Sequence, residues 1–253
     1  MRHWLVVCIL FLALGSCAPP CSDDPACSRV LFIGNSYTFY NDLPKTFAKL
    51  AQAGDKRVET GMVASGGWAL SDHVNSAETL DQIKSSQWNF VVLQEQSLVP
   101  ASEERRATEM YPMVRTLVAK IKETGATPVL FVTWAHRGGW REVGLPGYEN
   151  MQLQINEGYI GIAEEINAPL APVGFAWLKL WKQNPQISLW QADGSHPNEK
   201  GTYLAACVFF ALLYRQSPES LSYTGNLSTD EAQILQKIAA DTVLKESWRW
   251  NLP

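Results

Sequence analysis

Short apolar segments alternate with longer segments of helical character along most of this 253-residue chain. The apolar segments have the length of buried strands, and turn residues separate them from the helical segments. The expected strands cover residues 29–33, 57–63, 88–94, 127–133 and 168–173. The expected helices cover residues 41–53, 70–85, 102–123, 148–166, 175–181, 198–214 and 229–248. This alternation predicts an α/β fold in which a parallel sheet has helices on both faces.

One domain is expected to hold all of these elements. The chain is 46% hydrophobic and 18% charged, which is enough apolar material for one sizeable core. No internal repeat, low-complexity block or second linker interrupts it. We therefore predict a single domain over residues 29–253.

The first 28 residues have a different character from the rest of the chain. Arg2 and His3 precede an apolar run over residues 4–14, which is typical of a signal peptide and too short to span a bilayer comfortably. The run ends in Leu-Gly-Ser-Cys17, which resembles a bacterial lipobox. We predict a signal peptide over residues 1–16, lipidation of Cys17 and a tether over residues 17–28, so that the protein is exported and anchored in the cell envelope. An ordinary secretory signal cut elsewhere is the alternative.

The remaining cysteines and the charge balance limit the partners. Cys21 and Cys27 could pair in an oxidising compartment, whereas Cys207 lies in an apolar segment and is expected to pack in the core. The formal net charge is −4, with no long basic run, which argues against nucleic acid as a partner. The apolar segment at residues 205–213 is about half the length of a membrane span.

Polar residues follow the expected strands at the edge where ligands bind in parallel sheets. The first strand leads into Gly34-Asn35-Ser36, the second into Ser65-Gly66-Gly67, and the third into Gln94-Glu95-Gln96-Ser97. Late in the chain comes the sequence Asp193-Gly194-Ser195-His196-Pro197.

The Asp-x-x-His sequence is the most informative of these motifs. An acid three residues before a histidine can reach the imidazole across a tight turn and aim its other nitrogen outward. Ser36 at the end of the first strand is then the natural nucleophile for Ser-His-Asp acyl transfer, with His196 as base and Asp193 as the orienting acid. The same residues could instead serve as turn and cap residues. Their joint occurrence at strand ends favours the catalytic interpretation.

Taken together, these motifs resemble those of the SGNH (GDSL-like) hydrolase superfamily over roughly residues 29–214. The resemblance implies a three-layer α/β/α fold with a flavodoxin-like parallel sheet of about five strands. It implies a Ser36-His196-Asp193 triad and an oxyanion hole formed by Ser36, Gly67 and Gln94. The departure from the family pattern is Gln94, which stands where an asparagine is usual. A glutamine can donate the same hydrogen bond from one methylene further out.

Four further residues follow expected strands and are candidates for substrate contacts. Trp68 and Trp134 could stack on a sugar ring, and Arg137 could bind a carboxylate beside His136. Ordinary packing and a solvated loop charge are the alternatives. Neither His73 nor His136 has partners at metal-ligand spacing, so we predict no catalytic metal and no cofactor.

The function expected from these residues is that of a serine esterase. The resemblance favours small acyl esters, with acetyl groups on a carbohydrate as the expected case, as small-molecule or polysaccharide substrates. One alternative is an O-acyltransferase that uses the same triad. Another is a non-catalytic surface glycan-binding lipoprotein with an ineffective oxyanion hole. The oligomeric state is left open.

Overall fold

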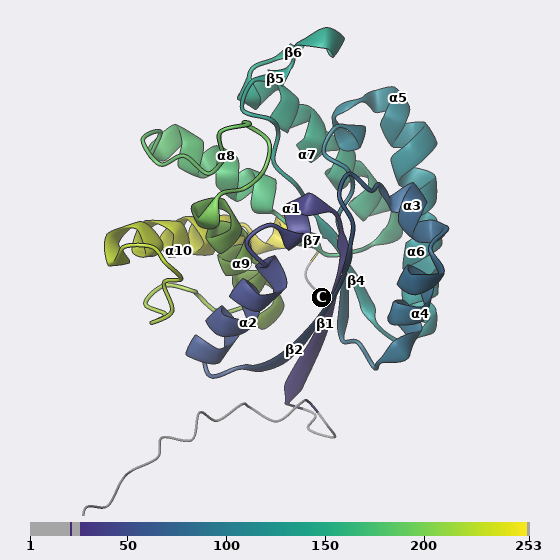
Figure 1. Cartoon of the computed structure of the whole chain (residues 1–253), viewed down its shortest axis with the longest axis horizontal. Helices are drawn as coiled ribbons and strands as arrows, with labels where there is room; N and C mark the ends of the chain where they lie inside the picture. Colours follow the sequence, from purple (N-terminus) through teal and green to yellow (C-terminus); the bar gives the residue numbers. More distant parts are fainter. Residues whose placement is uncertain (1–20, 22–25, 252–253) are drawn as a thin grey trace, which may run out of the picture.

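A computed structural model of the chain describes Cys21 and residues 26–251. The predicted signal peptide and Cys17 lie outside the described residues. The main feature is a sheet of five parallel strands in the order β2-β1-β3-β4-β7 (Figure 1). The strands are β1 (Cys27–Gly34), β2 (Arg57–Ala64), β3 (Phe90–Leu93), β4 (Thr127–Phe131) and β7 (Leu170–Ala171). This order confirms the predicted flavodoxin-like sheet.

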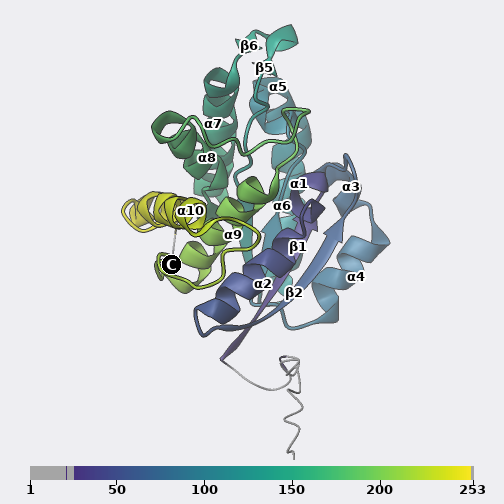
Figure 2. The same cartoon turned by 60° about the vertical axis from the view of Figure 1, so that its left-hand side comes forward.

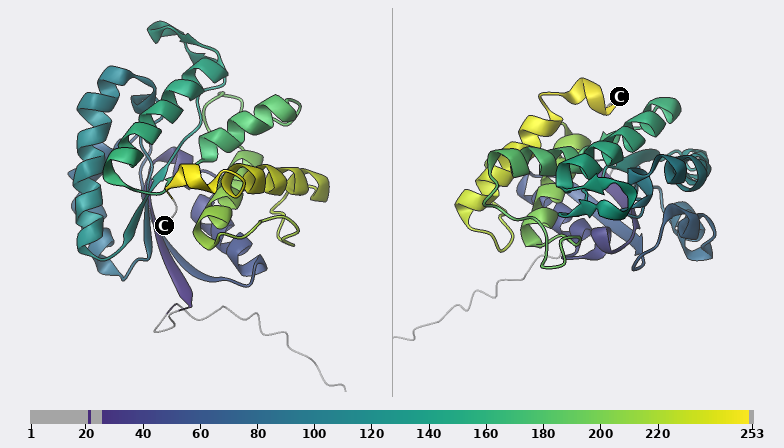
Figure 3. Two further views of the ribbon diagram at one scale, coloured as in Figure 1. Left: turned by 180° about the vertical axis from the view of Figure 1, so that it is seen from behind. Right: turned by 90° about the horizontal axis from the view of Figure 1, so that it is seen from above.

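Helices cover both faces of the sheet and give three layers (Figures 1 and 2). One face carries α2 (Leu43–Ala53), α8 (Val173–Gln183), α9 (Glu199–Tyr214) and α10 (Thr229–Val243). The other carries α3 (Leu70–Val74), α4 (Ala77–Ser85) and α6 (Tyr111–Glu123). The view from behind shows α7 (Tyr148–Ile166), which contacts both α8 and β7 (Figure 3).

Helix α9 is the central helix of its layer. Every residue from Gly201 to Leu212 is buried, because α2, α8 and α10 pack around it. Such all-round burial explains why the segment is apolar on every side. Cys207 is a free, fully buried cysteine within this helix, as expected for a core residue. Among the described helices, none combines the length and apolarity needed to span a bilayer.

Two predicted helices are interrupted. Asn75 and Ser76 separate α3 from α4, and the Ser76 side chain caps α4 by accepting from the N–H of Thr79 at 3.2 Å. The predicted helix at residues 102–123 begins with α5 (Glu103–Arg105) and a π-helical turn, η2 (Arg106–Met110), before α6. Pro112 near the start of α6 has no N–H to continue an α-helical ladder, which accounts for the irregular turn before it.

A small hairpin follows β4 and was not expected from the sequence. It pairs β5 (Gly139–Trp140) with β6 (Leu145–Pro146) around the short helix η3 (Arg141–Val143). Gly139 has a φ of +71°, and a Cβ there would collide with the backbone of residues 145 and 147. The remaining short elements are α1 (Ser36–Phe39), η1 (Val99–Ala101) and η4 (Ser247–Trp250).

The amino end of the domain corrects the predicted boundary. Strand β1 begins at Cys27 rather than at Arg29, and Cys27 forms a disulfide with the buried Cys21. Part of the predicted tether therefore belongs to the fold. Because Cys27 is the first residue of β1, the disulfide lies one strand length away from Ser36, which follows the other end of that strand.

Candidate active site

The turn after β1 places Ser36 at the first position of α1, at the carboxyl edge of the sheet. Asn35 caps this helix, because its Oδ1 accepts from the N–H of Tyr37 at 3.1 Å. Its Nδ2 donates to the carbonyl of Trp68 at 2.8 Å. Asn35 thus connects the turn that carries Ser36 to the loop that follows β2.

Gly34 is required in this turn by the side chains that surround it. A Cβ at Gly34 would overlap the side chains of Gln94 and Thr38. The Gly34 carbonyl is bonded by Nε2 of the fully buried His73 at 2.9 Å. Burial lowers the pKa of His73, so the imidazole is neutral and donates to this carbonyl. The nucleophile turn is therefore fixed from several sides.

The turn before α9 presents the predicted base. Gly194 adopts a φ of +70°, and Asp193 Oδ1 accepts from the N–H groups of Ser195 and His196 at 2.9 and 3.0 Å. Asn198 caps α9, because its side-chain oxygen accepts from the N–H of Gly201 at 3.0 Å. The Asp-Gly-Ser-His sequence forms a tight turn because glycine tolerates the left-handed backbone and aspartate satisfies the exposed donors.

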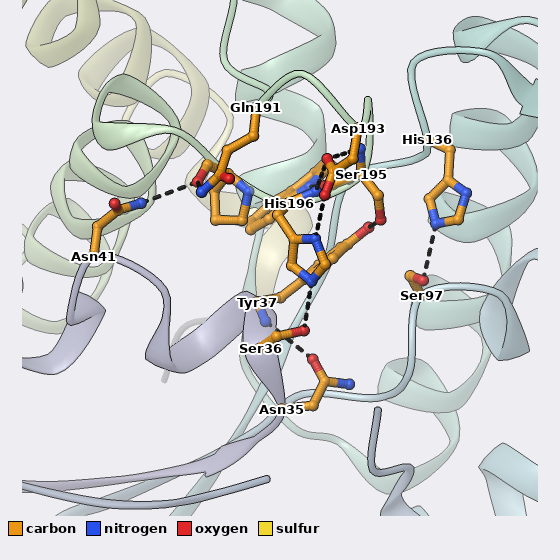
Figure 4. A network of polar contacts seen from close by, with 12 residues as sticks. Asn35, Ser36, Tyr37, Asn41, Ser97, His136, Gln191, Asp193, Ser195 and His196 are labelled. Carbon is orange, nitrogen blue, oxygen red and sulfur yellow. Dashed lines mark hydrogen bonds and ion pairs between the residues drawn. The ribbon is translucent and has the colours of Figure 1, made fainter. Parts of the chain in front are cut away.

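The three predicted catalytic residues meet in one hydrogen-bonded line (Figure 4). His196 Nε2 lies 3.0 Å from Ser36 Oγ, and His196 Nδ1 lies 2.6 Å from Asp193 Oδ2. Burial acts to raise the pKa of Asp193, but the hydrogen bonds from Ser195 and His196 outweigh it and hold that pKa below its ordinary value. Asp193 is therefore ionised at neutral pH. It can orient the imidazole while His196 takes the proton of Ser36.

Aromatic rings hold His196 in place. Tyr40 stacks on the imidazole with ring centroids 4.4 Å apart, and Tyr37 meets it edge-on at 5.9 Å. The Tyr37 hydroxyl also lies 2.7 Å from Ser195 Oγ. These contacts restrict the ring to the orientation in which Nε2 faces Ser36, which is the orientation a general base needs.

Two backbone donors are available for an oxyanion. Neither the N–H of Ser36 nor that of Gly67 donates a hydrogen bond within the part of the chain that the structure describes. Gly67 has a φ of +76° and open space around its Cα. Free backbone N–H groups beside a nucleophile are the usual donors to the oxygen that becomes charged during acyl transfer.

Gln94 does not have the predicted role. Its side chain is fully buried, and Oε1 accepts from the N–H of Asn35 at 2.8 Å and from Thr38 Oγ1 at 2.9 Å. Its Nε2 donates to the carbonyl of Glu95 at 2.6 Å. The glutamine amide is long enough to fold back beneath the nucleophile turn. Gln94 therefore supports the turn from below instead of facing a substrate.

The predicted role of Trp134 in stacking on a sugar ring is also wrong. This tryptophan is fully buried between the rings of Tyr37 and Trp177, at centroid distances of 4.5 and 4.0 Å. Its Nε1 donates to the carbonyl of Ser195 at 3.0 Å. Trp134 thus packs beneath the turn that carries His196 and cannot stack on a sugar.

The other predicted substrate residues lie closer to the surface. Trp68 is half-buried beside Gly67, and Arg137 is exposed with its N–H bonded to the carbonyl of Gly194 at 2.8 Å. His136 is half-buried, and its Nε2 lies 3.1 Å from Ser97 Oγ (Figure 4). Burial lowers the pKa of His136, whereas the charge of Asp193 acts to raise it.

Gln96 and Glu95 had no role expected from the sequence. Gln96 is half-buried, its Oε1 accepts from the N–H of Leu98 at 2.8 Å, and its Nε2 has no partner among the described residues. Glu95 is almost fully buried. The sequence does place both residues in a polar run at the end of a strand. Such a run does not indicate which of its side chains turn inward. Within the described residues, no group of three or more His, Cys, Asp or Glu side chains could hold a metal ion.

The fold and the Ser-His-Asp geometry define a serine hydrolase of ester bonds. A solved structure from Slackia heliotrinireducens, described as a candidate SGNH hydrolase, is 31% identical to this chain. The match covers 72% of this chain and 97% of that protein, with a TM-score of 0.61. The chain belongs to the SGNH (GDSL-like) hydrolase superfamily.

More distant structures share the fold. A DUF4886 family protein from Bacteroides uniformis is 18% identical, with a TM-score of 0.76 over 86% of this chain and 95% of its own. An acetylxylan esterase from Geobacillus stearothermophilus is 19% identical, with a TM-score of 0.56 over 72% and 92%. No protein-family model and no curated protein matches the sequence.

Proposed function

We propose that the protein is a serine esterase that removes small acyl groups, with acetyl esters of a carbohydrate as the substrate class. The observation that carries this proposal is the 3.0 Å contact between Ser36 Oγ and His196 Nε2, with Asp193 behind the imidazole. A serine hydroxyl becomes an effective nucleophile only when a base can take its proton as attack begins. Structures of the same fold that include acetylxylan esterases support the choice of substrate.

The proposed reaction follows the positions of these groups. Ser36 Oγ attacks the ester carbonyl as its proton moves to His196 Nε2, and Asp193 stabilises the imidazolium that forms. The N–H groups of Ser36 and Gly67 bind the oxyanion. His196 then gives the proton to the leaving alcohol, and a water molecule repeats the sequence on the acyl-enzyme to release the acid.

We propose Gln96 as the third oxyanion donor in place of Gln94. Gln96 follows the same strand and its carboxamide oxygen is held by Leu98, whereas its Nε2 is free of partners in the described chain. One such donor contributes about 3 kcal/mol to transition-state stabilisation. We expect Gln96→Ala to lower kcat about 100-fold with little change in KM.

The residues at the rim suggest where the carbohydrate binds. Trp68 is half-buried beside the proposed oxyanion donor Gly67, where its exposed part can contact a sugar ring. His136 and Arg137 lie on the other loop that borders the triad, where polar side chains can bind sugar hydroxyls.

Export and lipidation at Cys17 complete the proposal. Strand β1 has 8 residues and so spans about 26 Å. It begins at Cys27 and ends next to Ser36. A protein anchored through Cys17 would thus carry its active site on the edge opposite the attachment point, facing material outside the membrane. Cys17→Ser would release the protein from the membrane fraction, whereas retention of the variant there would contradict the anchor.

The test of the activity is hydrolysis of p-nitrophenyl acetate by the purified protein and by Ser36→Ala. We expect turnover in the wild type and background rates in the variant. Acetylated xylo-oligosaccharides would then be compared with a longer p-nitrophenyl acyl ester. Preference for the longer ester would contradict the acetyl assignment, and product that appears only with a sugar acceptor would indicate acyl transfer. Wild-type turnover equal to that of Ser36→Ala would refute the proposed nucleophile.

A further inference from the structure

Glu95 is a buried carboxylate that the proposed reaction does not use. It is the second residue after β3, and only 1% of its surface is exposed. A carboxylate at such a position is costly, because ionisation in a low-dielectric interior is unfavourable unless the charge is well paired. A neutral side chain would fill the same space at lower cost, so its contacts require an explanation.

The two hydrogen bonds of Glu95 join two loops of the active site. Oε1 accepts from the N–H of Leu70 at 3.0 Å and from the N–H of Gln96 at 2.7 Å. Leu70 is the first residue of α3 and lies three residues after Gly67. Gln96 is the proposed third oxyanion donor. A single oxygen atom therefore connects the backbones that carry two of the three proposed donors.

The start of α3 depends on this contact. Helices normally satisfy their first N–H groups with an N-cap side chain, but the N-cap residue here is Ala69, which has no side-chain acceptor. Glu95 supplies an acceptor to the first helical N–H from the loop that follows β3. Leu70 is only 1% exposed, so loss of that acceptor would leave its N–H buried and without a partner.

We propose that Glu95 is a positioning residue whose ionised carboxylate holds the Gly67 loop and Gln96 in register, so that its protonation loosens the oxyanion hole. This inference rests on the proposed esterase activity. Charge-assisted hydrogen bonds are roughly twice as strong as neutral ones, so the ionised form holds both loops more firmly.

The surroundings of Glu95 place its ionisation near neutral pH. Burial raises the pKa of Glu95 to about 7, against the lowering effect of the hydrogen bonds from Gln96 and Leu70. Among charged neighbours, Glu109 raises this pKa and Arg105 lowers it, and these two residues form an ion pair with each other at 2.8 Å. From α7, the Tyr159 hydroxyl accepts from the N–H of Glu95 at 3.3 Å.

Two titratable groups on α3 are already engaged. Asp72 accepts from the N–H of Ala69 at 2.8 Å, and His73 is bonded to Gly34 and Thr79. The ionisation of Glu95 is therefore governed by its burial and by the two loops that it joins.

The test combines NMR and kinetics on the purified protein and on Glu95→Gln, with Glu109→Gln as the matched control. Glu109 is a partly exposed neighbour with no bond to either loop, and its removal takes away the same charge. In the wild type, the amide resonances of Leu70 and Gln96 should shift together with a midpoint near pH 7. In Glu109→Gln both should still titrate together, at a lower pH, because Glu109 raises the pKa of Glu95. In Glu95→Gln neither amide should titrate in this pH range. Flat amides in the wild type, or titration that persists in Glu95→Gln, would overturn the proposal.

The kinetic arm separates a pH-dependent bridge from a purely structural contact. At pH 8 we expect kcat of Glu95→Gln to be about tenfold below wild type with KM unchanged, and at pH 6 the two rates should converge, because protonated Glu95 and glutamine are then equivalent acceptors. A constant ratio of rates at both pH values would refute the proposed gating. If the amides titrate as expected but no protein turns over any ester, the bridge is supported and the esterase proposal fails.

Discussion

The nucleophile side of the active site is buried and polar, whereas the base side is partly exposed. Around Ser36 the supporting side chains of Asn35, His73, Gln94 and Glu95 are all at most 3% exposed. On the base side, the side chains of His196 and Asp193 are 28% and 46% exposed. Buried polar groups are costly to leave unpaired, while exposed ones can turn to water. Substitutions of these four supporting side chains should therefore affect stability as well as catalysis.

The largest effect expected is the loss of activity in Ser36→Ala or His196→Ala. Each should lower kcat by about 10⁴-fold or more, because the nucleophile and its base act as a unit. Both residues lie at the surface of the site, so the free energy of unfolding should change by less than about 1 kcal/mol. Esterase assays and thermal melts measure the two effects. A large loss of stability in either variant would contradict the distinction between the catalytic side chains and the buried side chains that support them.

Trp134 connects the two sides, since it packs beneath the His196 turn and against Tyr37. Trp134→Ala should destabilise the protein by about 4 kcal/mol, through the cavity and the lost bond to the Ser195 carbonyl. Trp68→Ala is the matched control, because that tryptophan is only half-buried, and it should cost about 1 kcal/mol and mainly raise KM for a glycan ester. Urea titrations of both variants would test this, and equal destabilisation would show that Trp68 is also structural.

Gln94 and Gln96 are two residues apart in the sequence, and their substitutions have opposite expected effects. Gln94→Ala leaves the N–H of Asn35, the Thr38 hydroxyl and the Glu95 carbonyl without their partner, so about 3 to 4 kcal/mol of stability should be lost. Gln96→Ala should cost less than about 1 kcal/mol of stability, because its side chain makes one bond to the protein. Denaturation midpoints of the two variants measure this difference in stability. If Gln96→Ala were the more destabilising substitution, the assignment of Gln96 instead of Gln94 to the oxyanion hole would be contradicted.

The smallest expected effect is the pH dependence of stability in Glu95→Gln. The pKa of Glu95 is raised from 4.5 to about 7 in the folded protein, so the folded state binds the proton more tightly than the unfolded state does. The wild type should therefore lose stability as pH rises from about 4.5 to 7, by up to about 3 kcal/mol. Glu95→Gln has no carboxyl group to ionise at this position and does not lose stability in this way. It should therefore be the more stable protein above pH 7, and the difference in stability between the two proteins should shrink towards pH 5. A difference in melting temperature that is constant from pH 5 to 8 would contradict the buried ionisation.

The order of strands and helices was predictable from the sequence because buried strands and amphipathic helices repeat regularly. The positions of Ser36, Asp193 and His196 were predictable for a related reason, since the carboxyl ends of parallel strands gather at one edge. In the structure these residues meet in hydrogen-bonding distance.

The directions of individual side chains at strand ends were not predictable. Gln94 and Trp134 both follow strands, yet both fold inward, because the turn after β1 and the turn before α9 need buried partners. The hairpin of β5 and β6 has strands of two residues, too short for any hydropathy pattern. The π-turn before α6 depends on how the chain accommodates Pro112, which apolar periodicity does not describe.

The most direct test of the central claim is covalent labelling with a fluorophosphonate, followed by mass spectrometry of the peptides. The reagent reacts with a serine only when a base activates the hydroxyl and an oxyanion hole stabilises the adduct. We predict a single adduct on Ser36 in the wild type and none in His196→Ala. An unmodified Ser36, or an adduct on another serine while the ester is hydrolysed, would contradict the assignment of this site.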